Sequence, residues 1–462
     1  MDYPEPIGFY TTSDDEPLLF HILNVGEGLM VLIVFPDETT MLFDCNVTSE
    51  NEETILGYLR NNIPFRYDEE IDNSIQWIDI FVNSHRDEDH YKGLVKINSE
   101  FKIKSIWDSG ETGETTQSAD YQYYMTLRRR LRQKYGEDAV IIPIPSRDPL
   151  RRYGSAEIFC LNSSLDYEYA EGFLSISDYE ELIETMVLKE AKITHTHSIV
   201  LCVRYGNRSI LLPGDSDWKS WKDKIVPNFS DSGLLQSEIL VASHHGSRSF
   251  FTDETENENI DPENNPETTY IDSIYHIKPS ITLIPCGEYE TAHHPNKEAE
   301  QIYKKNTAHE QVYTTNDKRS LVGFVDMYGN WTVVPTRFTP ESNIRRNFRI
   351  NCDYEYEGET HDGNSGEDFP IGCQIHFTIS SGFGLFEPYD KVDVGFEVSN
   401  GGVDDDHDHQ DIYYKRKGER GGKLEFFRDV AYDGTHLLRC RVKNRKKKID
   451  ATQIFVVNGR HM

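Results

Sequence analysis

A short run of this chain concentrates side chains that can bind metal ions. Residues 84–93 read Ser-His-Arg-Asp-Glu-Asp-His-Tyr-Lys-Gly, which places His85, Asp87, Asp89 and His90 within six positions. Imidazole and carboxylate ligands in such density suit Zn²⁺ or Mn²⁺ and predict a site for two ions. A polar strand-to-helix turn, with an Asp capping the next helix, would use the same residue types.

Further candidate ligands follow later apolar segments. His195 and His197 precede an apolar run at 198–205, Asp215 ends the next run, and His294 follows a run at 281–286. His244 and His245 lie directly after the run 238–243. Adjacent residues of an extended strand point to opposite faces, so only one of His244 and His245 is expected to bind a metal directly if that segment stays extended.

The elements that must position these side chains can be predicted from apolar periodicity. The turn Gly206-Asn207 between two apolar runs is typical of a hairpin. Strands are predicted at 17–46 (two strands), 77–83, 100–107, 139–144, 155–160, 198–205, 208–213, 238–243 and 281–286, and helices at 50–63, directly after His90, at 119–135, 177–190 and 296–305. Strands that alternate with helices, each strand ending in part of one site, indicate an α/β domain.

These segments resemble the metallo-β-lactamase superfamily. His85-x-Asp87-x-Asp89-His90 is similar to its first metal motif, with Asp in place of the second His. That substitution resembles the branch that contains the hydrolase domain of the DNA-uptake channel protein ComEC. Four further segments are similar to that branch in the same order: Leu23–Gly28 with Met41–Asp44, Ser198–Asp215, Ser243–Ser247 and His294-Pro295. The resemblance spans roughly 17–335 and implies a four-layer α/β/β/α sandwich.

The chain departs from this family in two places. It has Glu27 and Leu29 where Gln and Asp are usual, and His195 where Asn is usual. In other branches a His near this position is the third ligand of the first metal. His195 therefore either completes that site or is an ordinary polar residue, and the same alternatives hold for His197.

The resemblance also implies roles for the candidate residues. His85 and Asp87, with His195 as a possible third ligand, would bind one metal, and Asp89 and His90, with His244 or His245, would bind the second. Asp215 would bridge the two ions. Asp89, His294 and Ser247 are the candidate catalytic residues, His294 protonating a leaving alkoxide or holding a phosphate oxygen with help from Ser247. Asp44 would orient a ligand imidazole.

Composition predicts a cytoplasmic protein that does not enter a membrane. The 462 residues are 37% hydrophobic, enough for two or three domains. No apolar run approaches the length of a membrane span, and the N-terminus lacks the basic and apolar parts of a signal peptide. Seven scattered cysteines without a CxxC motif indicate reduced thiols, mostly in the core.

The charge distribution limits the choice of substrate. The net charge is −31, of which residues 341–462 carry about −4 and residues 1–340 about −27. A protein that grips nucleic acid along its length usually presents a basic surface. Two basic clusters remain, at 128–134 on the predicted helix and at 443–448 in a predicted hairpin turn. The first could steer a phosphodiester toward the metals, although a solvated charged surface would look the same.

The character of the chain changes near residue 340. Residues 345–462 lack helical periodicity and show six or seven short strands between Gly, Asp and Asn clusters, which predicts a small all-β sandwich domain after a hydrolase domain at 1–340. Segments 394–402, 432–440 and 455–458 resemble the C-terminal sensor domain of bacterial adenylyl/guanylyl and signal-nucleotidyltransferase antiviral systems. That resemblance implies a regulatory domain that binds a trigger or partner protein.

Two polar segments are predicted to lie outside the cores. Residues 252–272 are expected to be a mobile loop, and they could cover the metal site. The run 404–409, Asp-Asp-Asp-His-Asp-His, is expected to be an acidic solvent loop, although its composition could bind a metal.

The expected function is a metal-dependent phosphodiesterase or nuclease that acts on DNA or another nucleotide phosphodiester, as an effector of antiviral defence. The alternatives are hydrolysis of a small cyclic or signal nucleotide, hydrolysis of a carboxylic ester or lactone, and a sensor without enzymatic activity. The fold alone does not choose among them. A structural metal site is disfavoured, because such sites are usually Cys-rich and closed.

Overall fold

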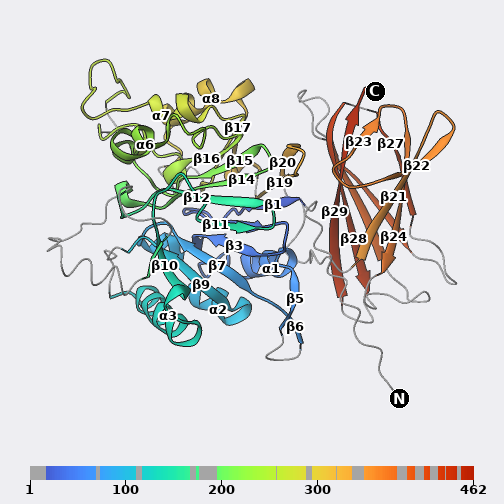
Figure 1. Ribbon diagram of the computed structural model, residues 1–462, viewed down its shortest axis with the longest axis horizontal. Helices are drawn as coiled ribbons and strands as arrows, with labels where there is room; N and C mark the ends of the chain where they lie inside the picture. Colours follow the sequence, from blue (N-terminus) through green and yellow to red (C-terminus); the bar gives the residue numbers. More distant parts are fainter. Residues whose placement is uncertain are drawn as a thin grey trace.

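The computed structural model describes residues 17–68, 73–110, 117–166, 173–175, 195–255, 258–287, 294–318, 320–335, 348–381, 393–400, 410–416, 425–431, 433–444 and 449–461. The predicted helix at 177–190 and the acidic run 404–409 lie outside these residues. The described part is a mixed α/β structure with several sheets (Figure 1).

A nine-stranded sheet occupies the first half of the chain. Its order is β13-β10-β9-β7-β3-β2-β1-β19-β20. The strands are β1 (Leu18–Ile22), β2 (Val31–Val34), β3 (Thr40–Phe43), β7 (Ile78–Asn83), β9 (Ile103–Asp108), β10 (Val140–Pro143), β13 (Phe173–Ser175), β19 (Leu321–Val325) and β20 (Trp331–Pro335). β1, β2 and β3, with the short strand at Cys45–Asn46, are four strands where two were predicted, and all their residues are buried. Two short pairs flank this sheet: β4 (Cys45–Asn46) with β8 (Tyr91–Lys92), and β5 (Phe65–Asp68) with β6 (Asn73–Gln76).

A second, seven-stranded sheet has the order β11-β12-β14-β15-β16-β17-β18. Its strands are β11 (Arg151–Tyr153), β12 (Ala156–Asn162), β14 (Val200–Tyr205), β15 (Arg208–Leu212), β16 (Ile239–Val241), β17 (Ile281–Ile284) and β18 (Val312–Thr314). β14 and β15 form the predicted hairpin, whereas β15 to β18 run parallel. The ends of β15, β16 and β17 therefore lie at one edge of the sheet.

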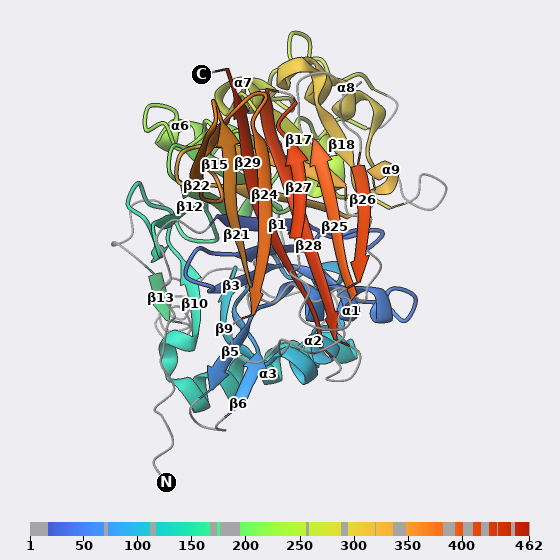
Figure 2. The same ribbon diagram turned by 90° about the vertical axis from the view of Figure 1, so that its right-hand side faces the viewer.

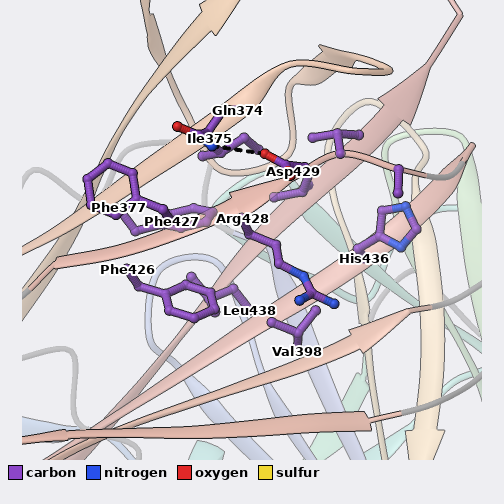
Figure 3. Close-up of a pocket in the computed structure, with 13 residues that line it drawn as sticks. Gln374, Ile375, Phe377, Val398, Phe426, Phe427, Arg428, Asp429, His436 and Leu438 are labelled. Atoms are coloured by element: carbon purple, nitrogen blue, oxygen red, sulfur yellow. Dashed lines mark hydrogen bonds between the residues drawn. The ribbon is translucent and has the colours of Figure 1, made fainter.

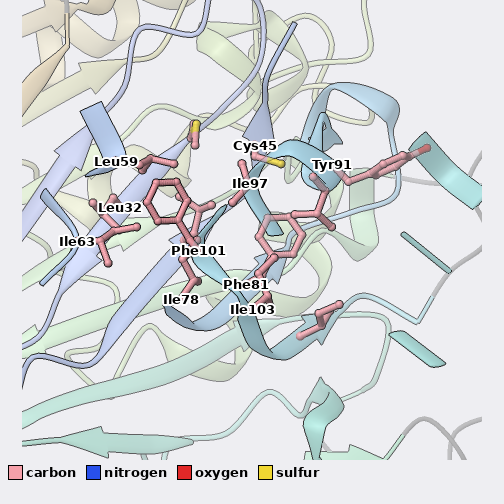
Figure 4. Close-up of a cluster of buried hydrophobic side chains, with 14 of the residues drawn as sticks. Leu32, Cys45, Leu59, Ile63, Ile78, Phe81, Tyr91, Ile97, Phe101 and Ile103 are labelled. Atoms are coloured by element: carbon pink, nitrogen blue, oxygen red, sulfur yellow. The ribbon is translucent and has the colours of Figure 1, made fainter. Parts of the chain in front are cut away.

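Three apolar cores hold these two sheets and their helices together. The first joins the nine-stranded sheet to α1 (Glu52–Asn62), α2 (Leu94–Phe101) and α3 (Ala119–Tyr135), with Leu59, Phe81 and Phe101 among its residues (Figure 4). The second contains residues of both sheets, such as Phe20 and Leu212. The third joins the seven-stranded sheet to α6 (Val226–Phe229), α7 (Asp272–Ile277) and α8 (Lys297–Asn306). The described residues also contain the short α-helices α5 (Trp218–Ser220), which continues through a π-helical turn into α6, and α9 (Thr315–Lys318).

Helix limits follow ordinary capping chemistry. The Ser118 side chain accepts a hydrogen bond from the backbone N–H of Tyr121 at the start of α3, and Gly136 ends that helix. Asn296 accepts hydrogen bonds from two backbone N–H groups at the start of α8. Both helices lie where the sequence predicted them. Among the described helices, none is long and apolar enough to cross a lipid bilayer.

The described residues between 348 and 461 form two further sheets (Figure 2). One has the order β22-β21-β24-β27 and the other β23-β29-β28-β25-β26. The strands are β21 (Phe348–Tyr356), β22 (Glu359–Gly363), β23 (Asp368–Pro370), β24 (Gln374–Ser381), β25 (Asp393–Asn400), β26 (Gln410–Arg416), β27 (Glu425–Asp429), β28 (Gly434–Asn444) and β29 (Ile449–Arg460). Both sheets contribute to one core that contains Phe377, Phe396 and Phe455. The pairs are antiparallel apart from β23 with β29.

The C-terminal sheets contact the first part of the chain directly. Val456 of β29 belongs to the core that also contains Leu19 and Leu59. Asn330 joins the two parts, because its side chain lies 3.5 Å from the Gly366 carbonyl oxygen and 3.5 Å from Arg460 Nη2. β29 therefore runs beside the larger unit (Figure 1).

Two other predictions can be compared with the structure. All seven cysteines are free and buried, as expected. In the described part of 252–271 the backbone is irregular, and a bridge between Thr252 and Thr269 joins the two ends of this loop. A role as a cover for the metal site stays a prediction.

Candidate metal centre

Strand ends from both sheets bring the predicted ligands together. In the nine-stranded sheet β3 and β7 are parallel, so Asp44 and the run 84–90 leave the sheet at the same edge. In the seven-stranded sheet Asp215, His244 and His294 follow the parallel strands β15, β16 and β17. Residues far apart in the sequence therefore meet, as is usual at the carboxyl ends of parallel strands.

Asp44 orients His90. His90 Nδ1 donates to Asp44 Oδ2 over 2.8 Å, and both side chains are fully buried. Ser84 supports the carboxylate, since its backbone N–H and its hydroxyl both donate to Asp44 over 2.7 Å. With Nδ1 engaged in this way, Nε2 of His90 carries the lone pair that can bind a metal. Asp44 thus orients the His90 ring, and its predicted role behind a metal ligand stays a prediction.

Asp215 lies at the middle of the cluster. Its Oδ2 is 3.3 Å from His90 Nε2, 3.5 Å from His244 Nε2, 3.8 Å from His85 Nε2 and 3.9 Å from His245 Nε2. Its backbone N–H donates to Ser198 Oγ. The preceding Gly214 has a φ of +55°, and a Cβ there would lie 2.5 Å from Ser198 Oγ and 2.8 Å from Ser84 Cβ. Only glycine fits at this junction of the two sheets.

The side chains fall into two groups that each could hold one ion. His85, His195 and Asp215 offer ligand atoms within 4.8 Å of one another, and so do Asp89, His90 and His245. The Asp87 carboxylate lies beside the first group, 3.2 Å from His85 Nε2 and 3.6 Å from His195 Nε2. Asp87 and Asp89 are 31% and 41% exposed, so the cluster opens to solvent on their side.

The His244–His245 segment is not extended. The prediction that only one of these histidines can bind a metal assumed an extended strand. The strand β16 ends at Val241, and both histidines adopt left-handed backbone angles, with φ of +48° and +56°. This turn directs both Nε2 atoms to within 4 Å of Asp215 Oδ2. His244 Nδ1 is in addition hydrogen-bonded to Ser249 Oγ at 2.8 Å. Because the segment is not extended, the two rings do not point to opposite faces.

His195 is the member of the His195/His197 pair whose ring joins the cluster. Its centroid lies 5.4 Å from that of His85 and 4.4 Å from that of His244. The short turn that carries it is held by Asn162, whose side-chain amide donates to the Thr196 and Ser198 carbonyl oxygens. Thr196 also donates to Asp217 over 2.7 Å. The sequence did not indicate these supports, because they come from distant strands and loops.

The two remaining candidates, His294 and Ser247, occupy different positions. The His294 ring lies 5.4 Å from His244 and 6.2 Å from His245, between centroids, so it belongs to the cluster. Ser247 Oγ accepts a hydrogen bond from the backbone N–H of Ser249, which gives this hydroxyl a capping role. Its predicted assistance to His294 stays a prediction.

A buried ionic network behind the metal motif was missed by sequence reasoning. Arg86 Nη2 donates to Asp108 Oδ1 over 2.8 Å, and Arg128 Nε lies 3.2 Å from Asp108 Oδ2. The hydroxyl of Tyr124 donates to the same carboxylate. All four side chains are buried. The network anchors the segment after His85 to α3. It also holds the Arg128 side chain in the interior, so Arg128 is not available to steer a substrate as considered for the basic cluster.

Burial and charge act against each other on these ionisable groups. Burial opposes ionisation of Asp215, but His90 and the other surrounding histidines outweigh it and hold the pKa of Asp215 well below its ordinary range. Burial also opposes a charged His90, yet Asp215, Asp44 and Asp89 raise the pKa of His90 well above its usual value. Burial dominates at His244 and lowers its pKa to about 3. The carboxylates thus stay ionised, as ligands must be, whereas His90 would have to release its Nε2 proton to bind a metal.

The donor set fits divalent cations. Within the described residues, the Nε2 atoms of His85, His90 and His245 and Oδ1 of Asp215 are buried and make no hydrogen bond. Leaving one such atom unsatisfied costs roughly 1–3 kcal/mol, so several of them facing one another need a common partner. Imidazole nitrogens and carboxylate oxygens are ligands for Zn²⁺ and Mn²⁺.

Comparisons with known proteins add little to this geometry. No family model matches the chain, and no curated protein matches it. Among solved structures, the chain is similar to that of a glycoside hydrolase family 61 member, Cel61B from Hypocrea jecorina, with 10% identity and a TM-score of 0.16. The match covers 22% of this chain and 55% of that one. A likeness of this size supports no conclusion about fold or function.

Proposed function

We propose that this protein is a metal-dependent hydrolase of phosphodiesters that uses two ions. The observation that carries the proposal is the position of Asp215, whose Oδ2 lies within 4 Å of Nε2 atoms from four histidines. A carboxylate shared by two groups of ligands is what a bridged pair of ions requires.

The fold we propose for the larger unit is the four-layer α/β/β/α sandwich of the metallo-β-lactamase superfamily. Its support is the order of the three cores: helices against the first sheet, the first sheet against the second, and the second sheet against further helices. In the proposed arrangement, the ligand-bearing loops lie at the edge shared by both sheets.

Each residue then has a physical task. His85, His195 and Asp87 would hold one ion, and Asp89, His90 and His245 the other. Bound ions of this kind activate water and neutralise charge on a phosphoryl oxygen. Asp44 keeps Nε2 of His90 available as a ligand. His294, at the border of the cluster, would donate a proton to the leaving oxygen.

The proposed substrate is a short or small nucleotide diester. The net charge of −31 opposes a long polyanion, because each phosphate contact needs a cation. The inward turn of Arg128, which pairs with Asp108, removes one of the cations that could have guided such a polymer. DNA cleavage therefore needs a locally exposed strand or end, whereas a cyclic or linear signal nucleotide needs no long basic groove.

We extend the proposal to residues 348–461, as a regulatory unit of a bacterial antiviral effector. The two sheets with their own core support a separate module, and the contact of Val456 with the larger unit provides a route for coupling. A chain ending before residue 345 that keeps unchanged hydrolysis and unchanged cellular effect would contradict this part.

The decisive experiment compares substrates with purified protein and added Mn²⁺ or Zn²⁺. Single- and double-stranded DNA, RNA, cyclic dinucleotides, bis-p-nitrophenyl phosphate and p-nitrophenyl acetate are offered side by side. We expect diester hydrolysis that disappears in the Asp87→Ala/Asp215→Ala variant. Hydrolysis of the acetate ester alone, or no hydrolysis by protein shown to hold two ions, would overturn the proposal.

A further inference from the structure

A pocket of about 380 Å³ opens between the two C-terminal sheets (Figure 3). One sheet contributes Ile375 and Phe377 from β24 and Phe426 from β27. The other contributes Val398, Leu438 and Val457 from β25, β28 and β29. All six side chains are buried. The pocket is therefore an extension of the apolar core toward solvent.

Four polar side chains also line the pocket: Gln374, Arg428, Asp429 and His436. Asp429 accepts a hydrogen bond from Gln374 Nε2 over 3.1 Å, so that carboxylate is already engaged at the wall. Arg428 is the cationic side chain of the lining, and in Figure 3 its guanidinium extends toward the side where Val398 and His436 lie. His436 is 8% exposed and also lines this side. The pocket thus combines an apolar wall with one basic side.

An aromatic pair lies on the outer face of the four-stranded sheet. Phe427 lines the pocket and is 49% exposed, which is high for a phenylalanine. Its ring stacks on His376, with 4.2 Å between centroids and 10° between planes. Because Phe427 and His376 alternate with the core residues Phe426 and Phe377, this pair lies on the outer face of the sheet and is not part of the pocket's apolar wall.

We propose that this pocket binds a small amphiphile, with an apolar body between the two sheets and one anionic group at Arg428. Protein cores contain few voids larger than a water molecule, whereas small-molecule sites range from about 300 to 1,000 Å³. A carboxylate matches the fork of guanidinium N–H donors. The site is separate from the metal centre and does not depend on hydrolysis.

The test is calorimetric titration of the full-length chain with three ten-carbon probes below their micelle concentrations: decanoate, decanol and decyltrimethylammonium. We expect decanoate to bind with one site per chain, more tightly than decanol, and the cationic probe to bind weakest. Arg428→Gln should weaken decanoate about tenfold or more and leave decanol unchanged. The matched control is Arg152→Gln, which removes an exposed cation on β11 that pairs with Glu157.

Two further variants remove ambiguities. Val398→Phe should fill the pocket and weaken both decanoate and decanol, with a thermal unfolding curve recorded to show that it folds. Asp215→Ala should leave decanoate binding intact, which separates the pocket from the metal centre. Hydrogen exchange should show protection by decanoate at 374–377 and 426–431.

Three results would overturn the inference. The first is absence of decanoate binding to the wild-type chain. The second is loss of binding in Asp215→Ala together with retention in Arg428→Gln, since the carboxylate would then sit on the metals. The third is equal affinity for the anionic and cationic probes, because Arg428 would then play no part.

Discussion

Asp44 and His90 form a fully buried pair in which the carboxylate accepts a hydrogen bond from Nδ1 over 2.8 Å, while Nε2 of the same ring lies 3.3 Å from Asp215. One nitrogen is thus held by the protein and the other faces the candidate metal position. Since a carboxylate behind a ligand imidazole fixes its tautomer and orientation, Asp44 should control how well His90 binds a metal.

Replacing Asp44 with Asn tests this relationship. Asn suits the left-handed backbone at this position, where φ is +55°, so the fold should be retained. We expect metal affinity and diester hydrolysis to fall about 10–100-fold, because the neutral amide holds His90 less firmly. Metal titration and hydrolysis rates measure the effect. Asp148→Asn, at an exposed position, is the matched control, and equal metal affinity in the two variants would speak against the role of Asp44.

The two ligand groups predict different metal stoichiometries for single substitutions. His195→Ala and His245→Ala each remove a ligand from one group, so each should leave one tightly bound ion. Asp215→Ala removes the shared carboxylate and should leave neither ion tightly bound. Native mass spectrometry after desalting counts the ions. Two ions retained by Asp215→Ala would show that the groups do not depend on a common ligand.

Metal binding should stabilise the folded chain. Buried Nε2 atoms of His85, His90 and His245 gain partners when ions bind, and the unfolded chain offers no such site. At a free metal concentration of 100 times Kd, each site should add about 2.7 kcal/mol to the free energy of unfolding. Thermal unfolding with and without chelator measures the shift. If Asp215→Ala showed the same shift, the stabilising ion would lie elsewhere.

The network around Asp108 should matter for stability. Asp108→Asn leaves the buried Arg86 and Arg128 without a counter-charge, which should lower the free energy of unfolding by about 3–5 kcal/mol. Urea unfolding measures this loss. Glu137→Gln, in a partly exposed pair with Arg132, should cost less than about 1 kcal/mol. Equal losses in the two variants would argue against a buried charge network.

The same network predicts a pH dependence. Burial opposes ionisation of Asp108, but Arg128 and Arg86 outweigh it and lower its pKa from 3.8 to about 2. A lowered pKa stabilises the fold above the unfolded value and loses that contribution as the pH falls. The difference between wild type and Asp108→Asn should therefore be constant above about pH 5 and shrink from pH 3.8 toward 2. A difference that grew on acidification would contradict the assigned pairing.

Local patterns were sufficient for many of the elements and for the choice of candidate ligands, although strands such as β18, β19 and β20 were not predicted. α3 (Ala119–Tyr135) spans the predicted range and the β14–β15 hairpin has the predicted Gly206-Asn207 turn, because apolar periodicity and turn chemistry act over a few residues. The run from His85 to His90 was identifiable because its ligands are neighbours in the chain. Asp215 was identifiable as the end of a strand.

Tertiary structure decided what those residues do together. A left-handed turn at His244 and His245 brings both rings to one side. In an extended strand the two rings would point to opposite faces, so the sequence did not predict this arrangement. The sequence places Arg128 in a basic cluster, whereas in the structure its guanidinium is buried beside Asp108, twenty residues away in the chain. The sequence by itself determined which ligand types are present and where strands end. Only packing of the two sheets decided which histidines lie around Asp215, because the four come from two loops, one after β7 and one after β16.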